Sequence, residues 1–117
     1  MSEMFKNEFS FEKRLSESTK ILDKYENRIP VIITQSKECR LPPIDKNKYL
    51  IPFDLTIAQF LNVLRKRIKL DDSQSLYIYV NKSIMPATSA TFTSIYDKHK
   101  DKDGFLYLIY CGENTFG

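Results

Sequence analysis

The segment Thr56-Ile-Ala-Gln-Phe-Leu-Asn-Val-Leu-Arg-Lys-Arg-Ile-Lys69 carries the clearest helical pattern in the 117-residue chain. It begins with a capping box, in which Thr56 serves as the N-cap and Gln59 occupies the third helical position. Basic residues fill its last turn, where they face the negative end of the helix dipole. The apolar residues recur every three or four positions and form one stripe, made of Ile57, Phe60, Leu61, Leu64 and Ile68. The segment predicts an amphipathic helix with one buried face.

Short segments rich in β-branched and aromatic residues flank this helix on both sides. Two precede it and two follow it, at residues 28–34, 48–52, 76–80 and 105–110. Pro52 ends the second segment, which is typical of a strand at the edge of a sheet. A short helical turn is expected at residues 94–100. A long helix between two pairs of strands is the β-grasp plan, in which the helix crosses one face of a four-stranded mixed sheet.

Two helices are predicted ahead of the first strand. Apolar residues recur at helical spacing from about Ser10 to Tyr25, with Ser10 as the N-cap, and a shorter helix is expected around residues 2–7. The central strands are almost continuously apolar, so both of their faces should be buried, with the N-terminal helices on the second face. We therefore predict a single α+β domain over residues 1–117. It comprises a helical extension at 1–26 and a ubiquitin-like β-grasp at 27–117, whose last residues, 112–117, form a flexible tail.

The amino-acid composition limits the functions that this chain could have. The chain is 42% hydrophobic but has no apolar run long enough to cross a membrane and no signal-peptide pattern, so a soluble intracellular protein is expected. Cys39, Cys111 and His99 are too few for a tetrahedral zinc site, so no metal is expected. Residues 31–70 hold eight basic and three acidic side chains. This moderate excess favours acidic peptides or anionic headgroups as partners and disfavours nucleic acid.

Ten segments in order along the chain resemble the autophagy-related ubiquitin-like modifiers, the lipid-conjugated family that includes the GABA-receptor-associated protein. They are Phe11-Glu-Lys-Arg14, Asn27-Arg-Ile-Pro-Val31, Asp45-Lys46, Lys48-Tyr-Leu-Ile-Pro52, Asp54-Leu-Thr56, Gln59-Phe60, Arg65-Lys-Arg-Ile68, Ile95-Tyr96, His99-Lys-Asp-Lys-Asp-Gly-Phe-Leu-Tyr107 and Gly112-Glu-Asn-Thr-Phe-Gly117. A single glycine after phenylalanine, in place of a di-glycine, favours this family over ubiquitin itself.

The resemblance implies a modifier and scaffold that is not an enzyme. Gly117 would be joined to the amine of phosphatidylethanolamine by an E1-like and an E2-like enzyme, and a cysteine protease would process or delipidate the product. No cofactor is implied besides this covalent lipid. The chain would be a cytoplasmic monomer before lipidation. Afterwards it would act on autophagosomes and other intracellular membranes, where it recruits autophagy receptors.

The resemblance also implies two peptide-binding pockets on either side of the edge strand at residues 48–52, where an extended receptor peptide would add to the sheet. One pocket would take an aromatic anchor and is formed by Glu17, Ile21, Pro30, Ile32, Lys48, Leu50 and Phe105. The other would take an aliphatic anchor and is formed by Tyr49, Ile51, Pro52, Leu55, Phe60, Val63 and Leu64. The acidic residues that precede such peptides would meet Arg28, Lys46, Lys48 and Arg67.

Some of these residues could instead be ordinary core residues, because Ile32, Phe60 and Leu64 fit the core equally well. Tyr49, Leu50 and Arg28 are the stronger candidates, since a short edge strand rarely exposes large apolar side chains without a partner. Replacing Tyr49 or Leu50 by alanine is therefore expected to abolish peptide binding while leaving the thermal midpoint nearly unchanged.

A second surface is expected at Tyr77 and Tyr79, which, with Phe116, would contribute to recognition by processing or conjugating enzymes. A half-buried strand is an equal alternative for the two tyrosines. Two further functions stay open. A cysteine hydrolase would pair Cys39 or Cys111 with His99. A ubiquitin-like adaptor would bind the same peptides without ever being lipidated.

Overall fold

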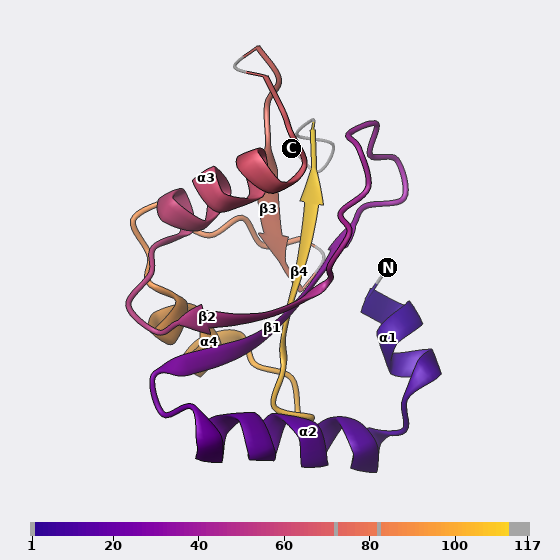
Figure 1. The fold of residues 1–117 in the computed structure, drawn as a ribbon, viewed down its shortest axis with the longest axis vertical. Helices are drawn as coiled ribbons and strands as arrows, with labels where there is room; N and C mark the ends of the chain where they lie inside the picture. Colours follow the sequence, from indigo (N-terminus) through magenta and orange to yellow (C-terminus); the bar gives the residue numbers. More distant parts are fainter. Residues whose placement is uncertain (1, 72, 82, 113–117) are drawn as a thin grey trace.

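The computed structural model describes residues 2–71, 73–81 and 83–112. Its elements follow the order α1 (Ser2–Glu8), α2 (Phe11–Lys24), β1 (Arg28–Gln35), β2 (Lys48–Pro52), α3 (Ile57–Arg67), β3 (Tyr77–Val80), α4 (Phe92–His99) and β4 (Leu106–Cys111) (Figure 1). The four strands form one sheet in the order β2-β1-β4-β3. β1 runs parallel to β4, whereas the two outer pairs are antiparallel. The predicted mixed β-grasp sheet with two added N-terminal helices is confirmed.

α3 covers one face of this sheet and has the predicted N-terminal cap, but it ends at Arg67, so Ile68 is its C-cap and Lys69 lies beyond it. The Thr56 side chain accepts from the Gln59 backbone N–H, and the Gln59 side chain accepts from the Thr56 N–H at 2.9 Å, which completes the capping box. Phe60 and Leu64 on its inner side are fully buried. The Phe60 ring packs edge-on against Tyr49 of β2 and Phe92 of α4. The larger core cluster therefore lies between the sheet and α3, with α4 closing one end.

α1 and α2 cover the other face, as expected from the apolar central strands (Figure 1). A smaller core cluster forms there from Phe5 of α1, Ile32 of β1, and Phe105 and Tyr107 at the start of β4, with Ile21 of α2 packed against it. Ser10 caps α2 by accepting from the Lys13 N–H. Two clusters on opposite faces leave Val31 and Leu108 in the central strands with no exposed surface.

The prediction was less accurate at α4, which begins at Phe92 and not at Ser94. Thr91 caps this helix by accepting from the Ser94 N–H, and Phe92 is its fully buried first residue. The expected helix omitted this first turn because Thr91 lies in a run of serines, threonines and alanines whose cap is not distinguished by spacing alone.

Candidate functional site

The exposed edge of β2 is the centre of the site. β2 pairs with β1 from Arg28↔Pro52 to Ile32↔Lys48, and it is the outermost strand of the sheet on this side. The outward-facing backbone groups of an edge strand can accept a further extended chain. The Arg28 guanidinium reaches across from β1 to the Leu50 carbonyl, with a nitrogen–oxygen distance of 3.4 Å.

Side chains of β2 alternate between the two faces of the sheet, as predicted. Tyr49 and Ile51 are buried in the cluster beneath α3. Lys48 and Leu50 are half-buried, and Lys48 points towards α2, where its ammonium lies 2.6 Å from both carboxylate oxygens of Glu17. The strand therefore presents one set of side chains to α2 and another to α3.

The seven residues predicted for the aromatic-anchor pocket come together on the α2 side. Ile32 and Phe105 lie fully buried at its base with Ile21 packed against them, and the Lys48–Glu17 ion pair bridges β2 and α2. Pro30 of β1 is the register partner of Leu50 of β2, so these two residues lie side by side across the two strands. Ile32 and Phe105 are thus core residues, whether or not they also contribute to the predicted pocket.

Sequence reasoning missed Phe5 in this region. Phe5 is 6% exposed, and its ring packs against Phe105 at a centroid distance of 5.3 Å and against the tilted ring of Phe9 at 5.2 Å. Phe5 therefore packs from α1 against a base residue of the predicted aromatic-anchor pocket. The spacing of Phe5 and Phe9, four positions apart with Phe9 directly after the end of α1, is the signal that could have indicated this apolar side.

The aliphatic-anchor residues separate into a buried base and an accessible rim. Ile51, Phe60 and Leu64 are buried in the α3 cluster with Tyr49. Leu55 and Pro52 are half-buried, and Val63 on the outer side of α3 is 44% exposed.

The expectation that Tyr49 is an exposed side chain is wrong. Only 7% of its surface is accessible, because its ring packs edge-on against Phe60 at a centroid distance of 5.8 Å. Because the ring is buried, alanine at this position is now expected to lower stability, in place of the unchanged thermal midpoint expected from the sequence. Leu50, which is half-buried, keeps the expected accessibility.

Four predicted cations surround β2, and two of them have acidic partners within the chain. Lys46 and Arg67 lie over the Tyr49 ring at 5.4 and 5.6 Å from its centroid. Burial raises the pKa of Tyr49, and the charge of Arg67 opposes that rise. Arg67 also contacts Asp45 at 3.3 Å, as Lys48 contacts Glu17. An acidic ligand would therefore compete with these two carboxylates.

At β3 the burial of the two tyrosines favours the alternative of a packed strand over that of an exposed aromatic surface. Tyr77 is half-buried, but Tyr79 is only 1% exposed, so the two rings do not form an open aromatic patch. Burial raises the pKa of Tyr79. The other predicted residues, Phe116 and the conjugation residue Gly117, lie outside the described part of the chain, as does most of the predicted tail.

The arrangement needed for a cysteine hydrolase does not form among the described residues. Cys39 and Cys111 line a cavity of about 190 Å³ between the loop after β1 and the end of β4. His99 ends α4 and lines a different cavity, together with Ile84 and Ile95. In the part of the chain that the structure describes, no group of three or more histidine, cysteine, aspartate or glutamate side chains could hold a metal ion. No helix there is long and apolar enough to span a membrane.

Comparisons with known proteins agree with this architecture. The family model described as "Autophagy protein Atg8 ubiquitin like" matches residues 13–117. Autophagy-related protein 8 of Saccharomyces cerevisiae is 52% identical over 117 residues, which cover 100% of this chain and 99% of that protein. The Mycosarcoma maydis protein of the same name is 53% identical, with coverage of 100% and 98%. A crystal structure of Trypanosoma brucei ATG8 superposes with a TM-score of 0.87 at 41% identity and covers 97% of each chain. The chain therefore belongs to the Atg8 family of ubiquitin-like autophagy proteins.

Proposed function

We propose that this chain is a ubiquitin-like modifier that is conjugated through Gly117 to phosphatidylethanolamine. On the membrane it would take part in autophagosome formation by recruiting receptors that carry aromatic-x-x-aliphatic motifs. The observation that best supports receptor binding is the edge strand β2, with one group of apolar residues towards α2 and another towards α3.

The spacing of the motif fits an added strand. Successive side chains of an extended peptide point to opposite faces, so residues three positions apart lie on opposite faces, about 10 Å apart along the strand. A peptide paired with β2 would direct its aromatic residue towards Leu50 and α2. Its aliphatic residue would then reach the rim formed by Leu55 and Val63 on the α3 side.

Charge would add selectivity to this pairing. Lys46 and Arg28 are exposed on either side of β2, and neither forms an ion pair with a carboxylate of the described residues. Acidic residues ahead of the aromatic anchor would be attracted to them, mainly as a salt-dependent contribution to association.

The conjugation step would use the residues that follow β4. Strand β4 ends at Cys111, so the six residues from Gly112 to Gly117 could extend by at most roughly 20 Å. A terminal glycine places no side chain beside the carboxyl carbon that E1-like and E2-like enzymes would activate. A phospholipid would supply two acyl chains and so anchor a cytoplasmic protein stably to autophagosomal and other intracellular membranes.

Receptor binding is tested by calorimetry with a peptide that carries a tryptophan, two intervening residues and a leucine after three acidic residues. Leu50→Ala should weaken binding at least tenfold because it removes apolar contact at the anchor, with little change in the thermal midpoint. Leu22→Ala is a matched control, since Leu22 is 38% exposed on α2 outside the predicted pockets. Equal affinity of wild type and Leu50→Ala would contradict the assignment of the groove.

Conjugation is tested in cells by intact-mass analysis before and after phospholipase treatment. Wild type should carry the mass of phosphatidylethanolamine, and Gly117→Ala should lose both this mass and membrane association. An unmodified wild-type chain that still binds the peptide would instead support the adaptor that is never lipidated.

A further inference from the structure

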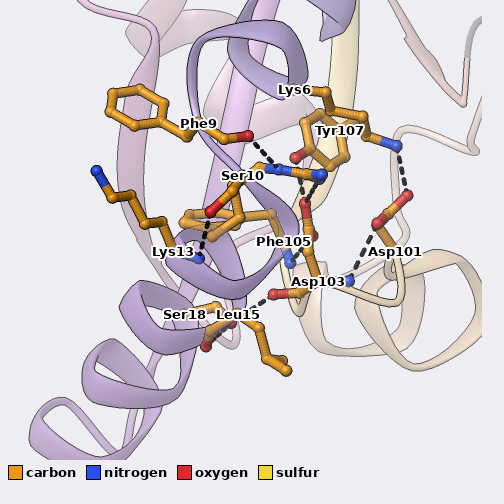
Figure 2. A network of polar contacts seen from close by, with 11 residues as sticks. Lys6, Phe9, Ser10, Lys13, Leu15, Ser18, Asp101, Asp103, Phe105 and Tyr107 are labelled. Carbon is orange, nitrogen blue, oxygen red and sulfur yellow. Dashed lines mark hydrogen bonds and ion pairs between the residues drawn. The ribbon is translucent and has the colours of Figure 1, made fainter.

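Asp103, in the loop between α4 and β4, is a fully buried carboxylate with 0% exposure. It accepts hydrogen bonds from the Arg14 guanidinium at 2.6 Å, the Phe105 backbone N–H at 2.9 Å and the Tyr107 hydroxyl. Figure 2 shows Asp103 between the helical segment that carries Ser18 and the residues Phe105 and Tyr107. One side chain thus joins α2 to the beginning of β4.

The backbone around Asp103 is held against α2 as well. The Ser18 hydroxyl donates to the Asp103 carbonyl at 2.6 Å. Gly104 follows with a φ of +89°, and a Cβ built there would lie 2.2 Å from the Ser18 oxygen. This close approach leaves the loop and α2 with essentially one relative position.

The protonation states of Arg14 and Tyr107 maintain these contacts between α2 and the loop. Burial by itself would lower the pKa of Arg14, but hydrogen bonds to Tyr107 and Asp103 outweigh it, so the guanidinium stays charged. Burial and the hydrogen bond to Asp103 raise the pKa of Tyr107, so its hydroxyl remains a donor. A buried ion pair contributes little net stability, because desolvation offsets most of the attraction, although removing one partner is costly. The clearest effect of the Arg14–Asp103 ion pair is therefore to fix the position of α2 relative to the loop before β4.

The two segments that Asp103 connects, α2 and the loop before β4, also carry the two sides of the predicted aromatic-anchor pocket. On one side, α2 carries Arg14 and Ser18 together with two residues of the predicted pocket: Glu17 lies three positions after Arg14, and Ile21 lies three positions after Ser18. On the other side, Phe105, whose N–H is held by Asp103, lies at the pocket base.

We propose that Asp103, acting through Arg14 and Ser18, is a positioning residue that sets the distance between the α2 wall and the Phe105 base. It would thereby set the affinity for the aromatic anchor but not for the aliphatic one. The inference deepens the proposed receptor binding and depends on it. Asp103 is buried and would not touch the peptide.

The test measures three peptides by calorimetry: one with tryptophan and leucine anchors, one with the tryptophan replaced by alanine, and one with the leucine replaced by alanine. In wild type both replacements should weaken binding. Asp103→Asn should weaken the first peptide about tenfold, within the range of coupling between contacting residues. It should shrink the effect of replacing tryptophan and leave the effect of replacing leucine unchanged. A general loss of stability would not produce this difference between the two anchors.

Tyr96→Phe is the matched control. The Tyr96 hydroxyl donates to the Gly104 carbonyl at 2.7 Å, so this variant removes a hydrogen bond to the same loop without touching Asp103 or α2. It should bind all three peptides as wild type does. Ser18→Ala removes the bond to the Asp103 carbonyl together with a bond to the Leu15 carbonyl within α2. It tests the proposal if Asp103→Asn does not fold, and it should show the same anchor-specific loss to a smaller extent.

Equal weakening of both anchor effects, or an unchanged tryptophan effect in folded variants, would overturn the positioning role while leaving receptor binding intact. A folded wild-type chain that binds none of the peptides would overturn the proposed receptor binding, and the positioning role with it.

Discussion

Gly104 combines a left-handed backbone conformation with a close approach to α2. Its φ of +89° is one that other residues rarely adopt, and a Cβ there would meet the Ser18 side chain. Gly104→Ala should therefore lower the free energy of unfolding by about 1–3 kcal/mol. Chemical denaturation measures this loss. Lys102→Ala is the control, since Lys102 is exposed in the same loop and should change stability by less than about 0.5 kcal/mol.

Tyr49 is the residue at which stability and proposed binding are hardest to separate. Its ring fills the space beside Phe60 in the buried cluster. Tyr49→Ala should therefore lower the free energy of unfolding by about 3 kcal/mol or more, because it creates a cavity. Tyr49→Phe keeps the ring and should change it by less than about 1 kcal/mol. Equal urea midpoints for Tyr49→Ala and wild type would show that the ring is not packed as described.

At the scale of elements, the sequence predicted what is encoded locally. Helix α3 followed from its capping box and apolar stripe, and β1, β2 and β4 followed from runs of β-branched and aromatic residues. The site residues on β2 followed from alternation together with the family resemblance. The burial of Tyr49 and Tyr79 could not be predicted, because it depends on residues distant in sequence. The spacing of Phe5 and Phe9 indicates an apolar side of α1, but not that this side packs against Phe105.

The capping box of α3 gives a prediction at this scale. Thr56→Ala removes the oxygen that accepts from the Gln59 N–H and should lower the free energy of unfolding by about 1 kcal/mol. Thr56→Ser keeps that oxygen and should retain most of the stability. Thermal denaturation distinguishes the two, and equal midpoints for the alanine and serine variants would show that the cap contributes nothing.

At the scale of the whole molecule, the fold buries a set of tyrosines whose phenol pKa values are raised above the ordinary value. Burial is the main cause of the raised pKa in every case, and the set comprises Tyr49, Tyr79, Tyr96, Tyr107 and Tyr110. For Tyr110, whose hydroxyl donates to the Pro42 carbonyl, the pKa rises to about 12. These phenols couple folding to alkaline pH, since the unfolded chain ionises at about pH 10.

The sign of this coupling follows from the raised values. The tyrosine contribution is fully present below about pH 10. It is lost as the pH rises from about 10 to the pKa of the folded state, because the unfolded chain has then released protons that the folded chain retains.

Tyr110→Phe should have a free energy of unfolding about 1 kcal/mol lower than that of wild type at neutral pH, because one hydrogen bond is lost. Between pH 10 and 12 its free energy of unfolding should fall less steeply than that of wild type, by up to about 1.4 kcal/mol per pH unit. Urea titrations across this range measure both slopes. Parallel curves for wild type and Tyr110→Phe would mean that the pKa of Tyr110 is the same in the folded and unfolded chains, and that its burial does not contribute to alkaline unfolding.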